Sequence, residues 1–196
     1  MRKWFVILWL SFILSGIAGL FWRLQWVYSL PTPVPVNYKP VKLGEPIDVG
    51  WKRETKPLFL HFFNPDCPCS RFNIPHFNSL VKLYGDKVDF AIVPMSSRAV
   101  TIKEIQDRFD LDIPVLLDTA IARLCGVYST PQAAIIDVHQ ILHYRGNYNK
   151  SRYCSDKRTE YAKIGLAGLL RSDATMVFDP IALKAYGCRL PLCTTK

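Results

Sequence analysis

Two cysteines lie where the surrounding backbone can make a thiol reactive. Cys67 and Cys69 fall in the run NPDCPCS (64–70), where an aromatic, strand-like stretch gives way to a helical pattern. The first turn of a helix offers unpaired N–H groups and the positive end of the helix dipole, and both lower the pKa of a thiol placed there. The charge of Asp66 opposes this effect, but its carboxylate can turn toward water. We therefore predict that Cys67 has the lowest thiol pKa among the cysteines and is the attacking thiolate.

The spacing of these two cysteines permits a disulfide without requiring one. Residues two apart can place their Cα atoms about 5.5 Å apart, within the disulfide range of about 4.4–6.8 Å. The small ring would be strained, and strained disulfides are more oxidising. Cys69 is the first candidate to resolve a mixed disulfide on Cys67, and Cys188 takes that role if the tail folds back over the site.

The other four of the six cysteines have simpler interpretations. Cys125 lies in an apolar stretch, which predicts a buried, inert thiol. Cys154, Cys188 and Cys193 lie in late loops and the tail, where a structural disulfide is expected more than a catalytic role. Six cysteines allow fifteen complete pairings, and the sequence does not choose among them.

Metal binding is the main chemical alternative to thiol exchange. Cys67 and Cys69 are soft ligands that suit Cu(I), with the four histidines (61, 76, 139 and 143) as helpers. A copper-binding assembly factor using Cys67 and Cys69 therefore stands beside the redox interpretation. That redox interpretation itself needs no metal and no cofactor.

Alternating strand and helix patterns position this turn. Apolar runs predict strands at 58–64, 88–94, 115–118 and 132–137, with a hairpin partner at 141–146. Helical spacing predicts helices at 69–84 (kinked at Pro75), 101–109, 120–127 and 158–170. Strands alternating with helices predict an α/β fold whose central mixed sheet is covered by helices on both faces.

The N-terminal segment predicts a membrane anchor. Residues 4–22 are nineteen residues without a charge, with Trp4 and Trp22 at the ends. At about 1.5 Å per residue they span roughly 28 Å, close to the thickness of a bilayer core. A cleaved signal peptide is the alternative, but its apolar region is usually shorter and ends at a small-residue site. Arg2 and Lys3 before the span place residues 1–3 in the cytoplasm and the rest across the membrane, which in a bacterium is the periplasm.

The remaining chain divides into a spacer and one domain. Residues 23–45 are rich in proline, which predicts an extended spacer that holds the domain off the membrane. Residues 46–196 are long enough for one domain with a C-terminal tail. The net charge is +9, but the basic residues are dispersed, without a basic run or a basic stripe interleaved with aromatics. Nucleic-acid binding is therefore not expected.

Several motifs of this domain resemble the thioredoxin-like, or redoxin, superfamily. The strand leading into Cys67 is one, and Ser129-Thr130-Pro131 before a strand is another. Residues 128–137 and 144–146 resemble membrane-anchored bacterial thiol–disulfide oxidoreductases, and the tail 183–190 resembles a poorly characterised redoxin subfamily.

The resemblance implies a function and assigns roles to residues. It implies a thiol–disulfide oxidoreductase of the bacterial inner membrane, single-pass, with protein thiols or disulfides as substrates and a separate redox partner. Thr130 and Pro131, the latter after a cis peptide, would present backbone to the substrate. The familiar motif is C-x-x-C with a proline eight residues after the first cysteine. Pro75 keeps that register, but Ser70 takes the place of the second cysteine. A non-catalytic thioredoxin-like binding module therefore remains a third interpretation.

Overall fold

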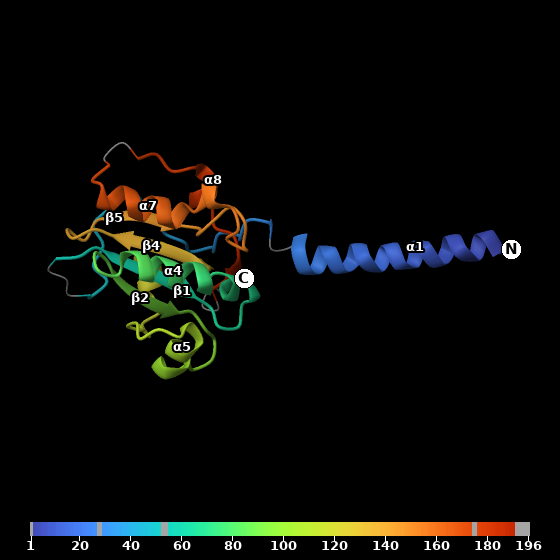
Figure 1. Cartoon of the computed structure of the whole chain (residues 1–196), viewed down its shortest axis with the longest axis horizontal. Coiled ribbons are helices and arrows are strands. Elements are labelled where there is room, and N and C mark those ends of the chain that lie inside the picture. The colour runs from blue at the N-terminus through green and yellow to red at the C-terminus, as the bar shows by residue number, and fades with distance from the viewer. Residues whose placement is uncertain (1, 27–28, 52–54, 174–175, 191–196) are drawn as a thin grey trace.

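The computed structural model describes residues 2–26, 29–51, 55–173 and 176–190 (Figure 1). Its strands are β1 (Leu58–Phe63), β2 (Asp89–Pro94), β3 (Ser129–Thr130), β4 (Gln132–Ile136), β5 (Leu142–Gly146) and β6 (Cys188–Arg189). Its α-helices are α1 (Arg2–Phe21), α3 (Pro68–Phe72), α4 (Ile74–Tyr84), α5 (Ile102–Phe109), α6 (Ala120–Leu124), α7 (Tyr161–Leu170) and α8 (Pro180–Leu183). A π-helical turn, Trp22–Trp26, continues α1, and a 3₁₀ turn, Lys157–Thr159, precedes α7.

A four-stranded mixed sheet forms the centre of the domain, in the order β2-β1-β4-β5. β1 pairs parallel with β2 and antiparallel with β4, and β4 pairs antiparallel with β5. The strand predicted at 115–118 is reduced to a single parallel bridge between Val115 and Ile92. A separate two-stranded sheet pairs β3 with β6 and lies at the same end of the domain as Cys67.

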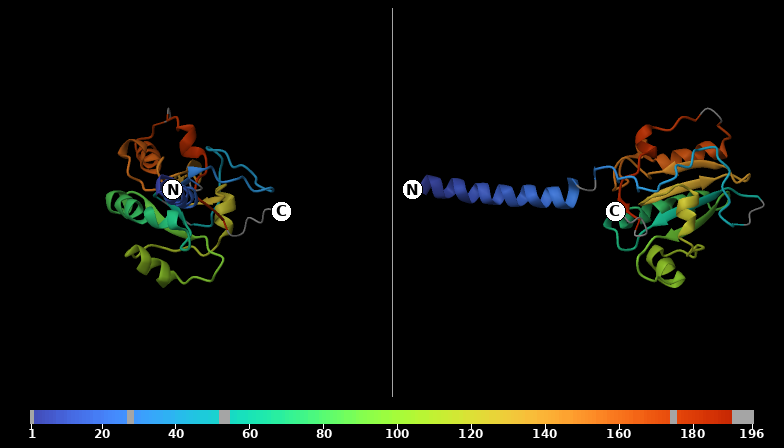
Figure 2. Two further views of the ribbon diagram at one scale, coloured as in Figure 1. Left: turned by 90° about the vertical axis from the view of Figure 1, so that its right-hand side faces the viewer. Right: turned by 180° about the vertical axis from the view of Figure 1, so that it is seen from behind.

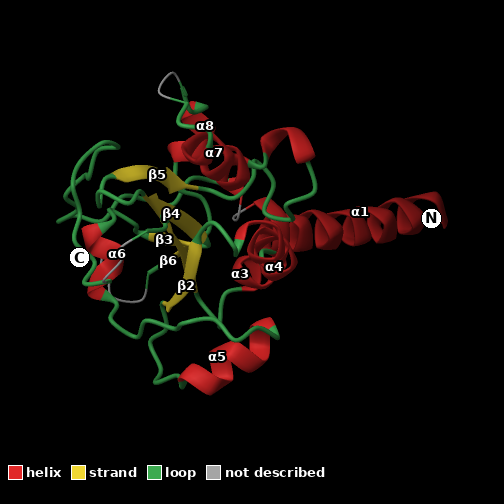
Figure 3. Ribbon diagram, turned by 60° about the vertical axis from the view of Figure 1, so that its left-hand side comes forward, coloured by secondary structure: helices red, strands yellow, loops and turns green. Residues whose placement is uncertain are grey.

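Side chains of β1 alternate between two cores, because successive residues of a strand point to opposite faces. Phe59 and Phe63 pack in one core with residues of α4, α5 and α7. Leu58, Leu60 and Phe62 pack in the other core with α6 and the segment 41–51. Helices therefore cover both faces of the sheet, as the sequence predicts (Figures 1 and 3).

The helix predicted at 69–84 is two helices that meet at Asn73. Pro68 lies in the first turn of α3, and Pro75 lies in the first turn of α4. Proline fits these positions because the first-turn N–H groups have no partner within the helix. The break lies two residues before Pro75, and it leaves α3 as a short turn between the end of β1 and α4.

One long apolar helix extends from the domain at its N-terminus (Figure 2). Among the described residues, Arg2–Trp26 is the helix long and apolar enough to cross a membrane, and its apolar window is fully exposed. A membrane anchor and a signal peptide both have this form.

The proline-rich segment contacts the domain that follows it. Pro31 forms an antiparallel bridge with Tyr186, and Pro46 forms one with Ile141. The Tyr38 hydroxyl donates a hydrogen bond of 2.8 Å to the carbonyl of Gly126. Proline prevents a helix here but leaves carbonyls and neighbouring N–H groups able to pair. The segment therefore lies along the domain from Pro31 onward.

Candidate active site

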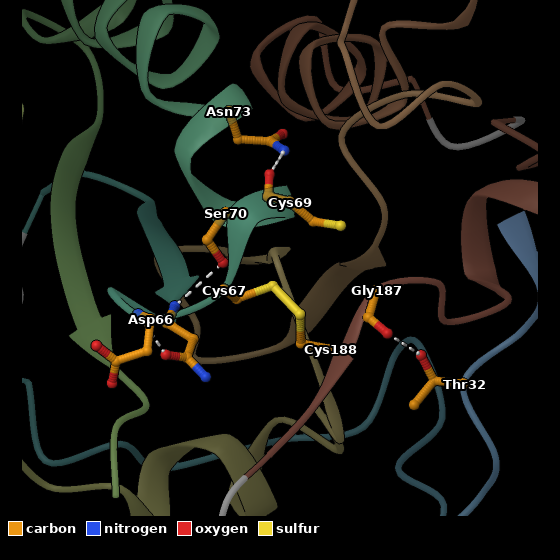
Figure 4. Close-up of a disulfide and its surroundings, with 9 residues drawn as sticks. Thr32, Asp66, Cys67, Cys69, Ser70, Asn73, Gly187 and Cys188 are labelled. Carbon is orange, nitrogen blue, oxygen red and sulfur yellow. Dashed lines mark hydrogen bonds between the residues drawn. A yellow bond between two sulfur atoms is a disulfide. The ribbon is translucent and has the colours of Figure 1, made fainter. Parts of the chain in front are cut away.

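The structure joins Cys67 to Cys188 and leaves Cys69 free (Figure 4). The Cα atoms of the bonded pair are 6.3 Å apart, although 121 residues separate them in the sequence. The sequence favoured Cys69 as the partner of Cys67, with Cys188 as the alternative if the tail folds back over the site. The structure has the alternative. The tail reaches Cys67 because β6 is held against the strand before Pro131.

The pairing of β6 with β3 fixes the position of Cys188. Thr130 is the register partner of Cys188. The Thr130–Pro131 peptide is cis, as predicted. Gly187 adopts φ +130°, and a Cβ there would lie 2.2 Å from the Thr130 carbonyl oxygen. Only glycine allows the tail to approach this closely, and the approach brings Cys188 to the sulfur of Cys67.

Ser70 holds the turn in which Cys67 lies. Its buried hydroxyl accepts a hydrogen bond of 3.2 Å from the backbone N–H of Asn64. The side-chain oxygen of Asn64 accepts one of 2.9 Å from the N–H of Asp66. The N–H of Cys67 donates to the Asn64 carbonyl at 3.1 Å. Ser70, at the usual position of the second cysteine, thus stabilises the turn through its hydroxyl and offers no thiol for exchange.

The carboxylate of Asp66 points away from the disulfide (Figure 4). It accepts a hydrogen bond of 3.1 Å from the Ser96 hydroxyl and lies 3.5 Å from the guanidinium of Arg98. The sequence interpretation expected this carboxylate to turn away from Cys67. In the structure, the carboxylate contacts the Ser96 hydroxyl and the Arg98 guanidinium.

Cys69 is a buried free thiol beside the disulfide. The sulfur atoms of Cys67, Cys69 and Cys188 all lie within 4.8 Å of one another. Burial raises the pKa of the Cys69 thiol, and the nearby Arg152 opposes that shift. Among the described residues no histidine joins this group, so the predicted histidine helpers are not at the sulfur cluster.

A cavity of about 270 Å³ lies next to Cys69. Its wall includes residues from the end of the N-terminal apolar helix, the chain after it, the cis-proline loop and the segment before α7: Gln25, Ser29, Pro131, Asn149, Lys150 and Arg152. The cavity therefore brings the third thiol, the cis-proline loop and the chain leaving the N-terminal apolar helix to one place.

The two other described cysteines, Cys125 and Cys154, are apart from this cluster. Cys125 is fully buried, as predicted, and burial raises its pKa to about 12. Cys154 is free, burial raises its pKa to about 12, and its thiol donates to the side-chain oxygen of Asn73 at 3.0 Å. The expected structural disulfide does not use Cys154, and Cys193 lies outside the described residues.

Three further residues shape the site, and sequence reasoning did not single them out. Asn73 is buried at the α3–α4 break, and its amide donates to the Cys69 carbonyl at 3.2 Å. Arg152 lies beside Cys69. Gly187 makes the close approach to Thr130. Gly187 could have been found from the sequence, because it directly precedes a cysteine in the tail. No sequence pattern marks Asn73 or Arg152 as part of the site.

The geometry can be compared with known proteins. A family model described as a domain of unknown function (DUF6436) matches residues 39–192. The chain belongs to this family. The match begins before residue 46, which agrees with the packing of the proline-rich segment on the domain.

A curated relative supports a place for the domain in the thioredoxin-like superfamily. The thiol-disulfide oxidoreductase ResA of Halalkalibacterium halodurans is 26% identical over 99 residues, which is 49% of this chain and 56% of that protein. The chain thus spans little more than half the length of this curated relative. The mixed sheet and the cis-proline that follows Thr130, the register partner of Cys188, agree with the same superfamily.

Two solved structures share the fold. An uncharacterized conserved protein from Geobacillus kaustophilus is 18% identical, with a TM-score of 0.62 over 82% of this chain and 97% of the other. A hypothetical protein from Sinorhizobium meliloti 1021 is 15% identical, with a TM-score of 0.61 over 78% of this chain and 95% of the other. The similarity to ResA and the Cys67–Cys188 disulfide support a redox function for this family member.

Proposed function

We propose that the chain is a single-pass protein of the bacterial inner membrane whose periplasmic domain is a thiol–disulfide oxidoreductase. The observation that carries this proposal is the Cys67–Cys188 disulfide beside the cis-proline loop. Disulfides persist in the periplasm, and the apolar helix preceded by Arg2 and Lys3 favours that location for the domain.

The reaction begins with both cysteines reduced. The Cys67 thiolate attacks one sulfur of a substrate disulfide, so that a Cys67–substrate bond forms, the substrate S–S bond breaks and one substrate thiolate leaves. The Cys188 thiolate then attacks Cys67, which releases the second substrate thiolate and forms the Cys67–Cys188 disulfide. Two electrons pass to the substrate, and the reverse steps oxidise a substrate dithiol. A separate protein dithiol or disulfide restores the starting state.

In this proposal the substrate and the tail use the same edge of β3. Thr130 is the residue proposed to present backbone to the substrate, and in the oxidised form it pairs with Cys188. The tail therefore lies where the substrate chain would lie, which makes the disulfide bond to Cys188 similar to a mixed disulfide with substrate. Reduction frees Cys188 and allows β6 to leave this edge.

Trapping of mixed disulfides with a peptide disulfide tests these roles. Cys188→Ser should accumulate an adduct on Cys67, because the resolving thiol is missing. Cys67→Ser should form no adduct. Cys125→Ser, which changes a buried thiol outside the site, should behave like the unchanged protein. Accumulation in Cys69→Ser and not in Cys188→Ser would assign the resolving role to Cys69, and adducts in Cys67→Ser would remove Cys67 as the attacking group.

A second function rests on the cluster of three sulfur atoms within 4.8 Å. Reduction of the disulfide would free Cys67 and Cys188 to act with Cys69 as thiolate ligands, which suit Cu(I). The copper content of the reduced chain, measured after incubation with Cu(I), tests this function. One tightly held copper per chain that is lost in Cys69→Ser supports it, and no retained copper contradicts it.

A further inference from the structure

The chain that leaves the anchor is fastened to the tail that carries Cys188. Pro31 forms a bridge with Tyr186, and the N–H of Thr32 donates to the Ala185 carbonyl at 2.9 Å. The Thr32 hydroxyl donates to the carbonyl of Gly187 at 3.1 Å (Figure 4). Gly187 directly precedes Cys188. The redox cysteine of the tail is therefore one residue from a contact with the chain that follows the anchor.

This attachment limits how far the disulfide can lie from a membrane. The apolar helix ends at Trp26, and Pro31 is the fifth residue after it. Five fully extended residues reach about 18 Å at most. The bridge to Tyr186 and two further residues to Cys188 extend this to about 30 Å. The limit follows from chain length and pairing, so it holds for any tilt of the anchor.

A second set of contacts connects the end of the anchor to the wall of the cavity. The guanidinium of Arg152 donates to the Leu24 carbonyl at 3.0 Å and to the side-chain oxygen of Gln25 at 2.7 Å. The Tyr153 hydroxyl donates to the same Gln25 oxygen at 3.0 Å. Gln25 and Arg152 line the cavity beside Cys69. Figure 2 shows the tail and the anchor at the same end of the domain.

We propose that the site acts on cysteines held close to the membrane surface, in the juxtamembrane segment of another membrane-bound protein. This inference rests on the proposed function, because it requires the helix to be an anchor and Cys67 to exchange disulfides. A partner disulfide that lies within about 30 Å of the bilayer is within reach, and one held much farther out is beyond it. The tether thus selects substrates by their distance from the membrane.

Two membrane-held substrates that differ in their distance from the bilayer test the proposal. The full chain is reduced, placed in vesicles, and mixed with a transmembrane peptide whose helix continues without a hinge to a terminal peptide disulfide. The disulfide stands about 10 Å or about 60 Å above the surface, set by helix length at about 1.5 Å per residue. A single-turnover assay measures formation of the Cys67–Cys188 disulfide. We expect the near substrate to react at least about tenfold faster than the far one, because the far disulfide lies beyond the reach of the tether.

A longer tether should remove this preference. An insertion of about 24 Gly and Ser residues between Leu30 and Pro31 adds about 27 Å of average reach and keeps the Pro31 and Thr32 contacts. With it, the near and far rates should come within about threefold of each other, because effective concentration depends on linker reach. The same Gly/Ser sequence appended after Lys196 is the matched control and should keep the preference of the unchanged chain.

Two outcomes separate this inference from the function on which it rests. Equal near and far rates in the unchanged chain overturn the distance selection and leave the oxidoreductase activity standing. No reaction with either substrate, or with the same peptide disulfide in solution, overturns the oxidoreductase activity and the inference together.

A reporter enzyme fused after Lys196 that is active only outside the cytoplasm should be active and stay in the membrane fraction. A soluble, shortened product would show a cleaved signal and overturn the tether.

Discussion

At the residue scale, a buried histidine lies behind the site. His61 is fully buried in the middle of β1, and its Nδ1 lies 2.6 Å from the Tyr148 hydroxyl. Its ring stacks on Phe77 with centroids 4.7 Å apart. Burial, with a smaller effect from the charge of His76, lowers the pKa of His61 to about 3. The neutral ring is therefore the form that the folded protein accommodates.

This pKa predicts a loss of stability on acidification. The unfolded chain binds a proton on His61 below about pH 6.5, whereas the folded chain does so only near pH 3. Stability is therefore present above pH 6.5 and lost as the pH falls toward 3. Denaturant unfolding of the full chain should show a free energy lower by about 2 kcal/mol at pH 5 than at pH 7 from this group.

A pair of variants isolates the histidine from the other acid-titrating groups. His61→Phe combined with Tyr148→Phe removes the titrating ring without leaving an unpaired hydroxyl. Between pH 7 and pH 5, the free energy of unfolding of this double variant should therefore fall by about 2 kcal/mol less than that of the unchanged chain. Tyr148→Phe alone keeps the ring and should keep most of the dependence on pH. Equal slopes in the unchanged chain and the double variant would contradict the role assigned to His61.

The individual site residues could be predicted from the sequence only where local spacing carried information. Cys67 follows a strand-like run, and Pro131 precedes one, so both positions were predictable, and the cis peptide at Pro131 is confirmed. The partner of Cys67 was not, because 121 residues of separation leave no local signal for Cys188. Cys69 ranked first only because it is near in sequence.

At the element scale, the placement of β6 decides whether Cys188 reaches Cys67. This strand has two residues, too few for any periodic pattern to reveal it in the sequence. The longer strands and helices were predictable because their apolar residues repeat over many positions. The α3–α4 break was missed by two residues, because Pro75 marks the first turn of α4 and not the end of α3.

Gly187→Ala should disrupt this placement. The added Cβ would lie 2.2 Å from the Thr130 carbonyl oxygen, so β6 must lift away from β3. Cys188 then moves away from Cys67, and the equilibrium constant for forming the disulfide should fall at least about tenfold, or about 1.4 kcal/mol. The fraction oxidised in a dithiol buffer, read by alkylation and mass, measures this change.

Gly50→Ala provides the matched control for backbone strain. Gly50 also has a positive φ, +69°, but nothing lies within 4 Å of its added Cβ. This variant should keep the redox equilibrium of the unchanged chain. An unchanged equilibrium in Gly187→Ala as well would show that the close approach to Thr130 does not position Cys188.

At the scale of the whole molecule, the tail joins Cys188 to the chain that follows the N-terminal apolar helix. The sequence predicted an extended segment that separates the domain from the membrane, because prolines exclude a helix. It did not predict that the segment packs on the domain, since pairing with residues 185–187 depends on where the tail folds. The N-terminal helix, the tail and the turn that carries Cys67 therefore meet at one end of the domain.

The central claim is that Cys67 and Cys188 form the redox pair of this molecule. The most direct test equilibrates the full chain over a range of dithiol-to-disulfide ratios, alkylates the free thiols and maps each cysteine by mass. Cys67 and Cys188 should lose their alkylation together in one two-electron step, with Cys125 and Cys154 alkylated at every ratio once the chain is denatured. Protection of Cys67 together with Cys69, while Cys188 stays free, would contradict the account.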